Sequence, residues 1–194
     1  MTDLTLPPLF NDCLSSHMES RCIIIIDPQV DFTSKDGAYA QRHPEINQII
    51  KAKESIQQLI DTSPYHSYIV VYSDYISDQF SEGSSMCIPN TPGHSVDIVI
   101  PPSTTRISKT QHSAFSNPSF ITHLRTHHFD HLHICGFLAE YCVKQTALDA
   151  LQNDFQVALI ADCIATGDDV SERKKKMLDE LNKNSATITF SSQL

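Results

Sequence analysis

Three side chains in the sequence, Asp27, Lys109 and Cys142, are of the types that nucleophilic catalysis needs. Asp27 ends a run of branched apolar residues, Lys109 ends a second strand-like segment, and Cys142 lies where a strand gives way to a helical pattern. The unpaired N–H groups and the dipole of a helix N-terminus favour a thiolate over a thiol. A carboxylate can accept the thiol proton, and an ammonium group can stabilise the charge that forms. The three positions therefore predict a cysteine nucleophile, an aspartate base and a lysine cation.

The turn that precedes Cys142 could supply a further part of such a site. Backbone N–H groups at a strand-to-helix turn can hold the charge that develops on a carbonyl oxygen, a contribution of roughly 3–4 kcal/mol per donor. Taken singly, each side chain also has a structural explanation, because aspartates form turns, lysines are mostly solvated and cysteines pack in cores. It is their joint position at the ends of three strands that favours catalysis.

Apolar runs and helical patterns alternate along the chain and predict the scaffold of this site. Residues 96–100 are either an edge strand or part of a loop, and clearer strands are predicted at residues 22–27, 67–72, 105–109, 131–137, 156–161 and 186–190. Apolar residues at helical spacing predict helices at residues 45–61, 118–127, 142–153 and 168–184. This alternation is typical of an α/β protein whose parallel sheet is covered on both faces. Ligands bind beyond the carboxyl ends of such strands, where the three side chains fall.

Length, charge and cysteine usage limit the class of protein. A chain of 194 residues suits a single domain over residues 1–194, with residues 1–20 as a loosely ordered N-terminal arm or short helix. The net charge of −9 argues against nucleic acid or an anionic membrane as partner, and no apolar run is long enough to cross a bilayer. The six cysteines form no C-x-x-C pair and the N-terminus lacks a secretion signal, so we expect reduced thiols and a cytoplasmic protein.

Three ordered motifs carry a resemblance to a known family: "IIIIDPQVDF" at residues 23–32, "SKTQHSAF" at 108–115 and "GFLAEYCVKQTALDA" at 136–150. With them the chain resembles the isochorismatase-like cysteine hydrolase superfamily, which includes nicotinamidases and ureide amidohydrolases. The resemblance implies a three-layer α/β/α sandwich around a six-stranded, mainly parallel, Rossmann-like sheet. This expectation agrees with the alternation of strands and helices described above.

The resemblance also assigns roles to single residues. It places the catalytic triad on Asp27, Lys109 and Cys142, a cis peptide bond between Phe137 and Leu138, and the oxyanion donors at the N–H groups of Leu138 and Cys142. The retained cysteine implies attack on the carbonyl of a C–N amide bond, release of ammonia or an amine, and hydrolysis of the thioester by water. We expect a small-molecule amide or ureide as substrate, no cofactor, and a homo-oligomer.

Several loop residues are candidates for substrate binding. Phe32 resembles the aromatic residue that packs against a planar substrate in the superfamily, although a place in the core under the loop fits the pattern equally well. Gln29 is more plausible as a hydrogen-bond partner that braces the loop than as a catalyst. We expect the aromatic residues Tyr75, Phe115 and Tyr141 to set the polarity of the pocket.

The chain departs from the metal-binding nicotinamidases at the positions that hold their metal. Those enzymes carry Asp-x-His after the second strand, then a second histidine, then a histidine directly before a cysteine. Here Asp74 is kept, but Ile76, Gln79 and Met86 stand at the three histidine positions. Isoleucine cannot ligate a metal, and methionine and amide side chains are poor zinc ligands. We therefore predict no metal at this site, with His94 as a nearby residue that could partly substitute.

Three functions remain open at this stage. The leading hypothesis is a metal-independent cysteine amidohydrolase. A second keeps nicotinamide as the substrate despite the missing histidines, and a third is a catalytically idle binding protein that keeps the fold. The histidine-rich stretch at residues 123–133 spans a helix end and a strand start on the edge opposite the predicted site, so we expect a surface role for it.

Overall fold

The computed structural model describes residues 21–62 and 67–194, so the predicted arm at residues 1–20 lies outside the described residues. Six strands form one parallel sheet in the order β3-β2-β1-β4-β5-β6. The strands are β1 (Arg21–Ile26), β2 (Tyr68–Ser73), β3 (Thr105–Lys109), β4 (His131–Gly136), β5 (Gln156–Ile164) and β6 (Thr187–Thr189). The prediction of an α/β protein with a six-stranded parallel sheet is confirmed.

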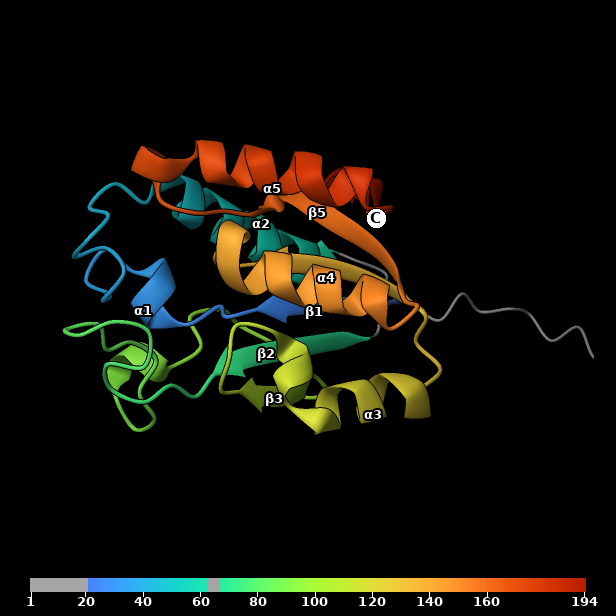
Figure 1. Ribbon diagram of the computed structural model, residues 1–194, viewed down its shortest axis with the longest axis horizontal. Coiled ribbons are helices and arrows are strands. Elements are labelled where there is room, and N and C mark those ends of the chain that lie inside the picture. Colours follow the sequence, from blue (N-terminus) through green and yellow to red (C-terminus); the bar gives the residue numbers. More distant parts are fainter. Residues whose placement is uncertain (1–20, 63–66) are drawn as a thin grey trace, which may run out of the picture.

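Helices cover both faces of this sheet, as Figure 1 shows. They are α1 (Val30–Thr33), α2 (Asn47–Thr62), α3 (Pro118–Thr126), α4 (Lys144–Gln152) and α5 (Glu172–Lys183). The helix α2 lies on one face, whereas α3, α4 and α5 lie on the other (Figure 1). Three layers of helix, sheet and helix result, as the sequence predicts.

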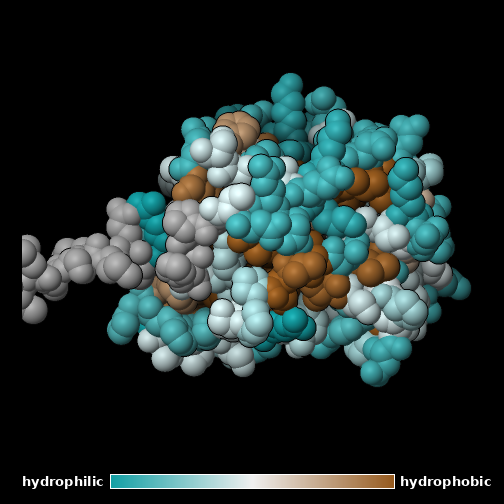
Figure 2. All heavy atoms as spheres, turned by 180° about the vertical axis from the view of Figure 1, so that it is seen from behind, coloured by the Kyte–Doolittle hydropathy of each residue, from teal (hydrophilic) through white to brown (hydrophobic). Residues whose placement is uncertain are grey.

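The strand β1 lies near the centre of the sheet and explains the unbroken isoleucine run of the sequence. Ile23, Ile24, Ile25 and Ile26 are each at most 1% exposed, because helices cover both faces of the strand. On α2 the apolar stripe is real, and Ile49, Ala52, Ile56 and Leu59 are its buried members. The polar sides of the helices face outward, and the rear view of the molecule in Figure 2 is mainly hydrophilic with a few apolar patches.

The structure resolves or corrects some boundaries. Residues 96–100 form a loop with an isolated antiparallel bridge between Val96 and Gln29 and no strand, so the loop alternative holds. The predicted helix at residues 168–184 begins with a separate 3-10 turn (Asp168–Val170) before α5. The helix expected from Cys142 is preceded by a π-helical turn, η3 (Ala139–Val143), which contains the cysteine.

A membrane-spanning helix is absent from residues 21–62 and 67–194, where no helix has both the length and the apolar character to cross a bilayer.

Gly136, the last residue of β4, gives a test of how tightly the strand end is packed. Its φ is 116°, and a Cβ atom there would overlap the backbone of Ile26 in β1. We expect Gly136→Ala to lower the free energy of unfolding by about 3 kcal/mol or more, from overpacking together with backbone strain. Gly83 is the matched control, because its φ is 70° and nothing lies within 4 Å of the added Cβ. Gly83→Ala should cost only about 1 kcal/mol. Urea unfolding followed by circular dichroism gives both values, and equal losses would contradict the close approach.

Candidate active site

The carboxyl ends of the strands bring the three predicted catalytic side chains together. Asp27 directly follows β1, Lys109 ends β3, and Cys142 lies in η3 between β4 and α4. The Nζ atom of Lys109 lies 2.9 Å from Oδ2 of Asp27 and 3.4 Å from Sγ of Cys142. One ammonium group therefore contacts both the acid and the thiol, as a catalytic triad of this kind requires.

Lys109 is the centre of this cluster and is 1% exposed. Besides Asp27 and Cys142, its Nζ donates to the Ser73 hydroxyl at 2.8 Å, the Tyr75 hydroxyl at 3.0 Å and the Gln111 carbonyl oxygen at 3.1 Å. Burial opposes the charge, but the Asp27 carboxylate and the other neighbours outweigh it and raise the pKa of Lys109 above its ordinary value. The side chain is thus a permanently charged ammonium group.

Ser73 completes the ion pair, and the sequence analysis missed it. Its hydroxyl donates to Oδ1 of Asp27 at 2.9 Å and accepts from Lys109. Ser73 ends β2, the strand between those of Asp27 and Lys109, and it is the register partner of Lys109. The position of Ser73, a small hydroxyl residue at the end of the strand between those of Asp27 and Lys109, could have indicated this role. The neighbouring Asp74 is the more conspicuous residue in the sequence.

Gln29 braces the loop after β1 and does not line the pocket. Its side chain is fully buried and accepts from the Ser73 N–H at 2.7 Å. It also donates to the carbonyl oxygens of Ser73 and His94, both at 3.0 Å. These bonds fix the position of Ser73, so the structure favours the bracing role over contact with substrate.

The surroundings of the Cys142 thiol favour its protonated form. Burial raises the pKa of Cys142 to about 12, and the positive charge of Lys109 lowers it less than burial and the Asp27 carboxylate together raise it. Burial thus opposes the stabilisation of a thiolate that the sequence leads us to expect from a helix N-terminus. Cys142 lies in the fourth position of η3 rather than at the start of a helix, and the low polarity of its surroundings dominates.

Two further side chains lie beside the sulfur atom. The hydroxyl of Tyr75 is 3.5 Å from Sγ of Cys142, and Nδ1 of His112 is 3.7 Å from it. Tyr75 was predicted at the substrate, but its hydroxyl also bonds to the ammonium group of Lys109. His112 was missed, although it follows Lys109 by three residues in the "SKTQHSAF" motif. Burial, and then the charge of Lys109, lower the pKa of His112, which favours a neutral imidazole.

The backbone turn before Cys142 has the N–H groups that an oxyanion would need. The peptide bond between Phe137 and Leu138 is cis, at the position that the resemblance implied. The carbonyl oxygen of Leu138 accepts from the N–H groups of Tyr141 and Val143, which flank Cys142 in the chain. The N–H of Leu138 itself donates to none of the residues that the structure describes. This donor is therefore available to a developing charge.

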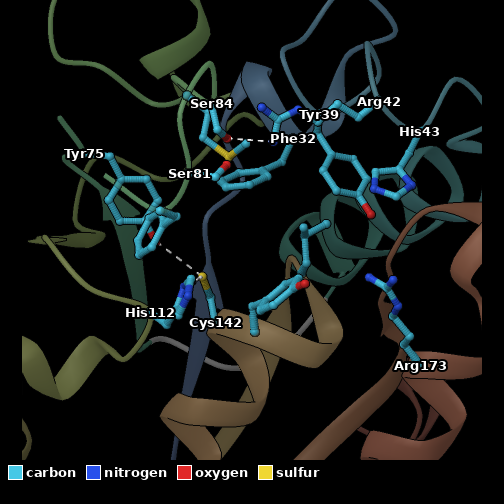
Figure 3. A pocket seen from close by; sticks show the side chains of 14 residues that line it. Phe32, Tyr39, Arg42, His43, Tyr75, Ser81, Ser84, His112, Cys142 and Arg173 are labelled. Carbon is cyan, nitrogen blue, oxygen red and sulfur yellow. Dashed lines mark hydrogen bonds between the residues drawn. The ribbon is translucent and has the colours of Figure 1, made fainter. Parts of the chain in front are cut away.

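A cavity of about 390 Å³ opens beside Sγ of Cys142 (Figure 3). Its wall is rich in rings, and the imidazole of His112 stacks between Phe80 and Tyr141, with centroid distances of 4.5 and 5.5 Å. The predicted binding residues Phe32, Tyr75 and Tyr141 line the cavity. Phe32 is also only 2% exposed, so it belongs both to the cavity wall and to the core, the two places that the sequence allows.

Phe115 does not line this cavity, and the structure corrects that prediction. Its ring packs edge-on against Phe120 at 5.0 Å between centroids and lies 6.0 Å from Phe155. The 3-10 turn Ala114–Ser116 directs it toward the core under α3. Ser113 begins this turn by accepting from the Phe115 N–H, which carries the chain away from the cysteine.

The positions that hold metal in related nicotinamidases do not form a metal site here. Oδ1 of Asp74 lies 2.6 Å from Nε2 of His94, so the retained carboxylate is paired with that histidine. Ile76 is 70% exposed, Met86 lines the cavity, and Gln79 bonds to the Thr110 carbonyl oxygen. Within residues 21–62 and 67–194 no three histidine, cysteine or acidic side chains gather closely enough to hold a metal. Two adjacent donors are too few for the closed coordination of a tightly held zinc ion.

Comparisons with known proteins identify the family and the fold of this chain. The profile of the isochorismatase domain family matches residues 21–193. A search among curated proteins finds no match. Among solved structures, pyrazinamidase from Pyrococcus horikoshii, solved in complex with zinc, is similar with a TM-score of 0.77 and 24% identity, covering 88% of this chain and 99% of its own.

Two other solved structures are similar. Nicotinamidase from Bacillus subtilis has a TM-score of 0.74 and 20% identity, and the match covers 88% of this chain and 99% of that chain. N-carbamoylsarcosine amidase from Thermoplasma acidophilum has a TM-score of 0.72 and 17% identity, and the match covers 90% of this chain and 98% of that chain. At these identities the likeness establishes a shared fold.

The protonation state of Cys142 can be tested by alkylation. Because the thiolate is the reactive form, the rate at which iodoacetamide modifies Cys142 should still be rising at pH 9 in the wild-type protein. Asp27→Asn removes a charge that raises the thiol pKa and should speed alkylation at a given pH, whereas Lys109→Met should slow it. Peptide mapping by mass spectrometry gives the rate at Cys142 alone.

Asp74→Asn is the matched control, because it removes a carboxylate that pairs with His94 outside the cluster. It should leave the rate unchanged, and circular dichroism checks that each variant is folded. A wild-type rate that levels off below pH 8 would mean that the resting cysteine is a thiolate.

Proposed function

We propose that this chain, which belongs to the isochorismatase domain family, is a cysteine hydrolase that cleaves the C–N amide bond of a small molecule through a thioester. One observation carries the proposal: a buried ammonium group, Lys109, contacts both a carboxylate and a thiol at the edge of a cavity. A structural ion pair needs no thiol beside it, and a structural cysteine needs no opening to a cavity.

In the first half-reaction the Cys142 proton passes to Asp27 as the sulfur forms a bond to the carbonyl carbon of the substrate. The carbonyl oxygen becomes an oxyanion, which the N–H groups of Leu138 and Cys142 stabilise. When the tetrahedral intermediate collapses, the C–N bond breaks and the nitrogen takes the proton from Asp27. Ammonia or an amine leaves, and the acyl group remains on the sulfur as a thioester.

In the second half-reaction a water molecule replaces the amine. Asp27 takes a proton from the water, and the oxygen forms a bond to the thioester carbon. Collapse of this intermediate breaks the C–S bond, and the sulfur recovers its proton from Asp27. Asp27 carries the negative charge between these steps, and the oxyanion carries it in each tetrahedral intermediate. Lys109 stays beside the acid and the sulfur atom throughout.

The substrate class is a small planar amide or ureide. The stacked rings of Phe80, His112 and Tyr141 suit a flat ligand, and N-carbamoylsarcosine amidase is among the structures of the same fold. Nicotinamide is the second candidate, because the same ring wall could stack on a pyridine ring and two of the similar structures are a nicotinamidase and a pyrazinamidase. An idle binding protein explains less, since it would need none of the Asp27–Lys109–Cys142 contacts.

The reaction needs no metal in this proposal. The zinc-dependent route of related nicotinamidases does not fit a site in which isoleucine, glutamine and methionine replace the histidines and His94 takes the remaining carboxylate. The chain's own residues supply every proton transfer described above.

An assay of amide hydrolysis tests the proposal directly. Ammonia release is measured for nicotinamide, N-carbamoyl amino acids, biuret and simple aliphatic amides. We expect Cys142→Ala and Asp27→Asn to lower kcat/KM by at least about a thousandfold on any substrate that is turned over, because nucleophile and base act as a unit. Asp74→Asn, the control, should keep most of the activity. Full activity in Cys142→Ala would exclude the thioester route.

Removal of metal gives a separate test. Protein dialysed against EDTA should keep its activity, and added zinc should not raise it, because the site offers zinc only Asp74 and His94. Metal content is measured by mass spectrometry on untagged protein. Activity that is lost on dialysis and restored by zinc would contradict the metal-independent route.

A further inference from the structure

We infer that the substrate carries an anionic group, such as a carboxylate, away from its scissile amide, and that Arg42 and Arg173 bind this group. The inference rests on the proposed function, because it concerns the other end of the cavity that opens at Cys142. It starts from two guanidinium groups that the catalytic steps do not use.

Arg42 and Arg173 line the same cavity as Cys142 although they come from distant parts of the chain. Arg42 lies in the loop between α1 and α2, and Arg173 lies in the first turn of α5. In Figure 3 Arg173 and His43 lie on one side of the cavity, and Cys142, His112 and Tyr75 lie on the other, while Arg42 reaches across to Ser84. Both guanidinium groups thus lie at the cavity and away from Cys142.

Three basic side chains lie at this end of the cavity, and Arg42 differs from the other two in its partners. Arg173 pairs with Glu140 at 3.2 Å, and His43 pairs with Asp169 at 2.8 Å. Arg42 donates only to neutral groups, the Ser84 hydroxyl at 2.8 Å and the Gly83 carbonyl oxygen at 3.0 Å. Among the residues that the structure describes, no carboxylate forms an ion pair with Arg42.

The catalytic end contributes no excess charge of its own, because Asp27 and Lys109 neutralise each other and Cys142 is a neutral thiol. Arg42 is therefore a cation at the cavity with which no carboxylate of the described residues forms an ion pair. Such a group favours an anionic ligand over a neutral one.

A guanidinium group has five N–H donors in a planar fork, and the contacts above leave some of them unused in both arginines. Carboxylates match this fork with two parallel hydrogen bonds. A cavity of about 390 Å³ with rings between the two ends fits a small amide or ureide that ends in a carboxylate, such as an N-carbamoyl amino acid or the half-amide of a dicarboxylic acid.

A competing explanation is that Arg42 only braces the loop at residues 81–84, to which it donates. Bracing would affect all ligands of the cavity alike, whereas an anion subsite distinguishes a charged ligand from its neutral analogue. The experiment therefore compares matched pairs: N-carbamoylglycine, N-carbamoyl-β-alanine and succinamate, each against its methyl ester.

Binding is measured first, by calorimetry with the Cys142→Ala variant, which cannot form the thioester. The acids should bind more tightly than their esters, and adding Arg42→Gln or Arg173→Gln should weaken acid binding by about tenfold or more while ester binding changes little. Arg42→Lys should restore part of the affinity. Lys176→Gln, on an exposed position of α5, is the control with the same change of charge and should alter nothing.

Turnover of the same pairs is then measured with arginine variants that keep Cys142. KM for the acids should rise by a similar factor, with little change in kcat. Equal binding of acids and esters, or an equal loss for both in Arg42→Gln, would overturn the anion subsite. The binding arm decides this even if no pair is hydrolysed, and an absence of hydrolysis by wild type across all amides counts against the proposed function alone.

Discussion

The candidate site depends on the buried ion pair between Asp27 and Lys109, whose side chains are both fully shielded from solvent. Breaking such a pair by removing one partner leaves an uncompensated charge in a medium of low polarity, at a cost of roughly 3–5 kcal/mol. The two charges stabilise each other. The Ser73 hydroxyl also donates to Asp27, and the hydroxyls of Ser73 and Tyr75 accept from the Lys109 ammonium group. The pair exists only because β1, β2 and β3 are in the register observed. A slip of one residue in β3 would turn Lys109 to the opposite face of the sheet.

Burial favours a neutral resting thiol beside this pair. It raises the pKa of Cys142 by more than the positive charge of Lys109 lowers it, and the Asp27 carboxylate raises the pKa further. In the proposed reaction the proton therefore leaves the sulfur as the sulfur attacks, and Asp27 accepts it. The negative charge passes from Asp27 to the carbonyl oxygen of the substrate, so the net charge of the site with its substrate does not change. A buried site can sustain such a step because no new uncompensated charge forms inside the protein.

The sequence was sufficient for the sheet and for the meeting of Asp27, Lys109 and Cys142, because both depend on local patterns. Unbroken apolar runs mark strands buried on both faces, Asp27 and Lys109 stand at the ends of strands, and Cys142 lies in the turn after β4. It was insufficient for the residues that tune the site. Whether Ser73 or Asp74 turns toward Asp27 depends on the pleat of β2 and its pairing with β3, which no short motif records. The prediction that Phe115 lines the pocket was wrong for a related reason, because a 3-10 turn after Lys109 points its ring into the core. His112, which is nearer to Lys109 in the chain, lies beside the sulfur atom instead.

The strand order explains why these particular strands bring Asp27, Lys109 and Cys142 together. In the order β3-β2-β1-β4-β5-β6, the chain leaves β1 toward one edge of the sheet and returns by way of α3 to β4 on the other side of β1. Connections that diverge on either side of β1 and β4 leave a crevice at their carboxyl ends, and Asp27 and Cys142 flank it. Lys109 comes from the edge strand β3, so its side chain must cross the end of β2 to reach Asp27. A long flexible stem with a compact charge can make this crossing in a narrow passage, and Ser73 is small enough to let it pass while bonding to its ammonium group. The site therefore requires a small hydroxyl residue on β2 as much as it requires the lysine itself.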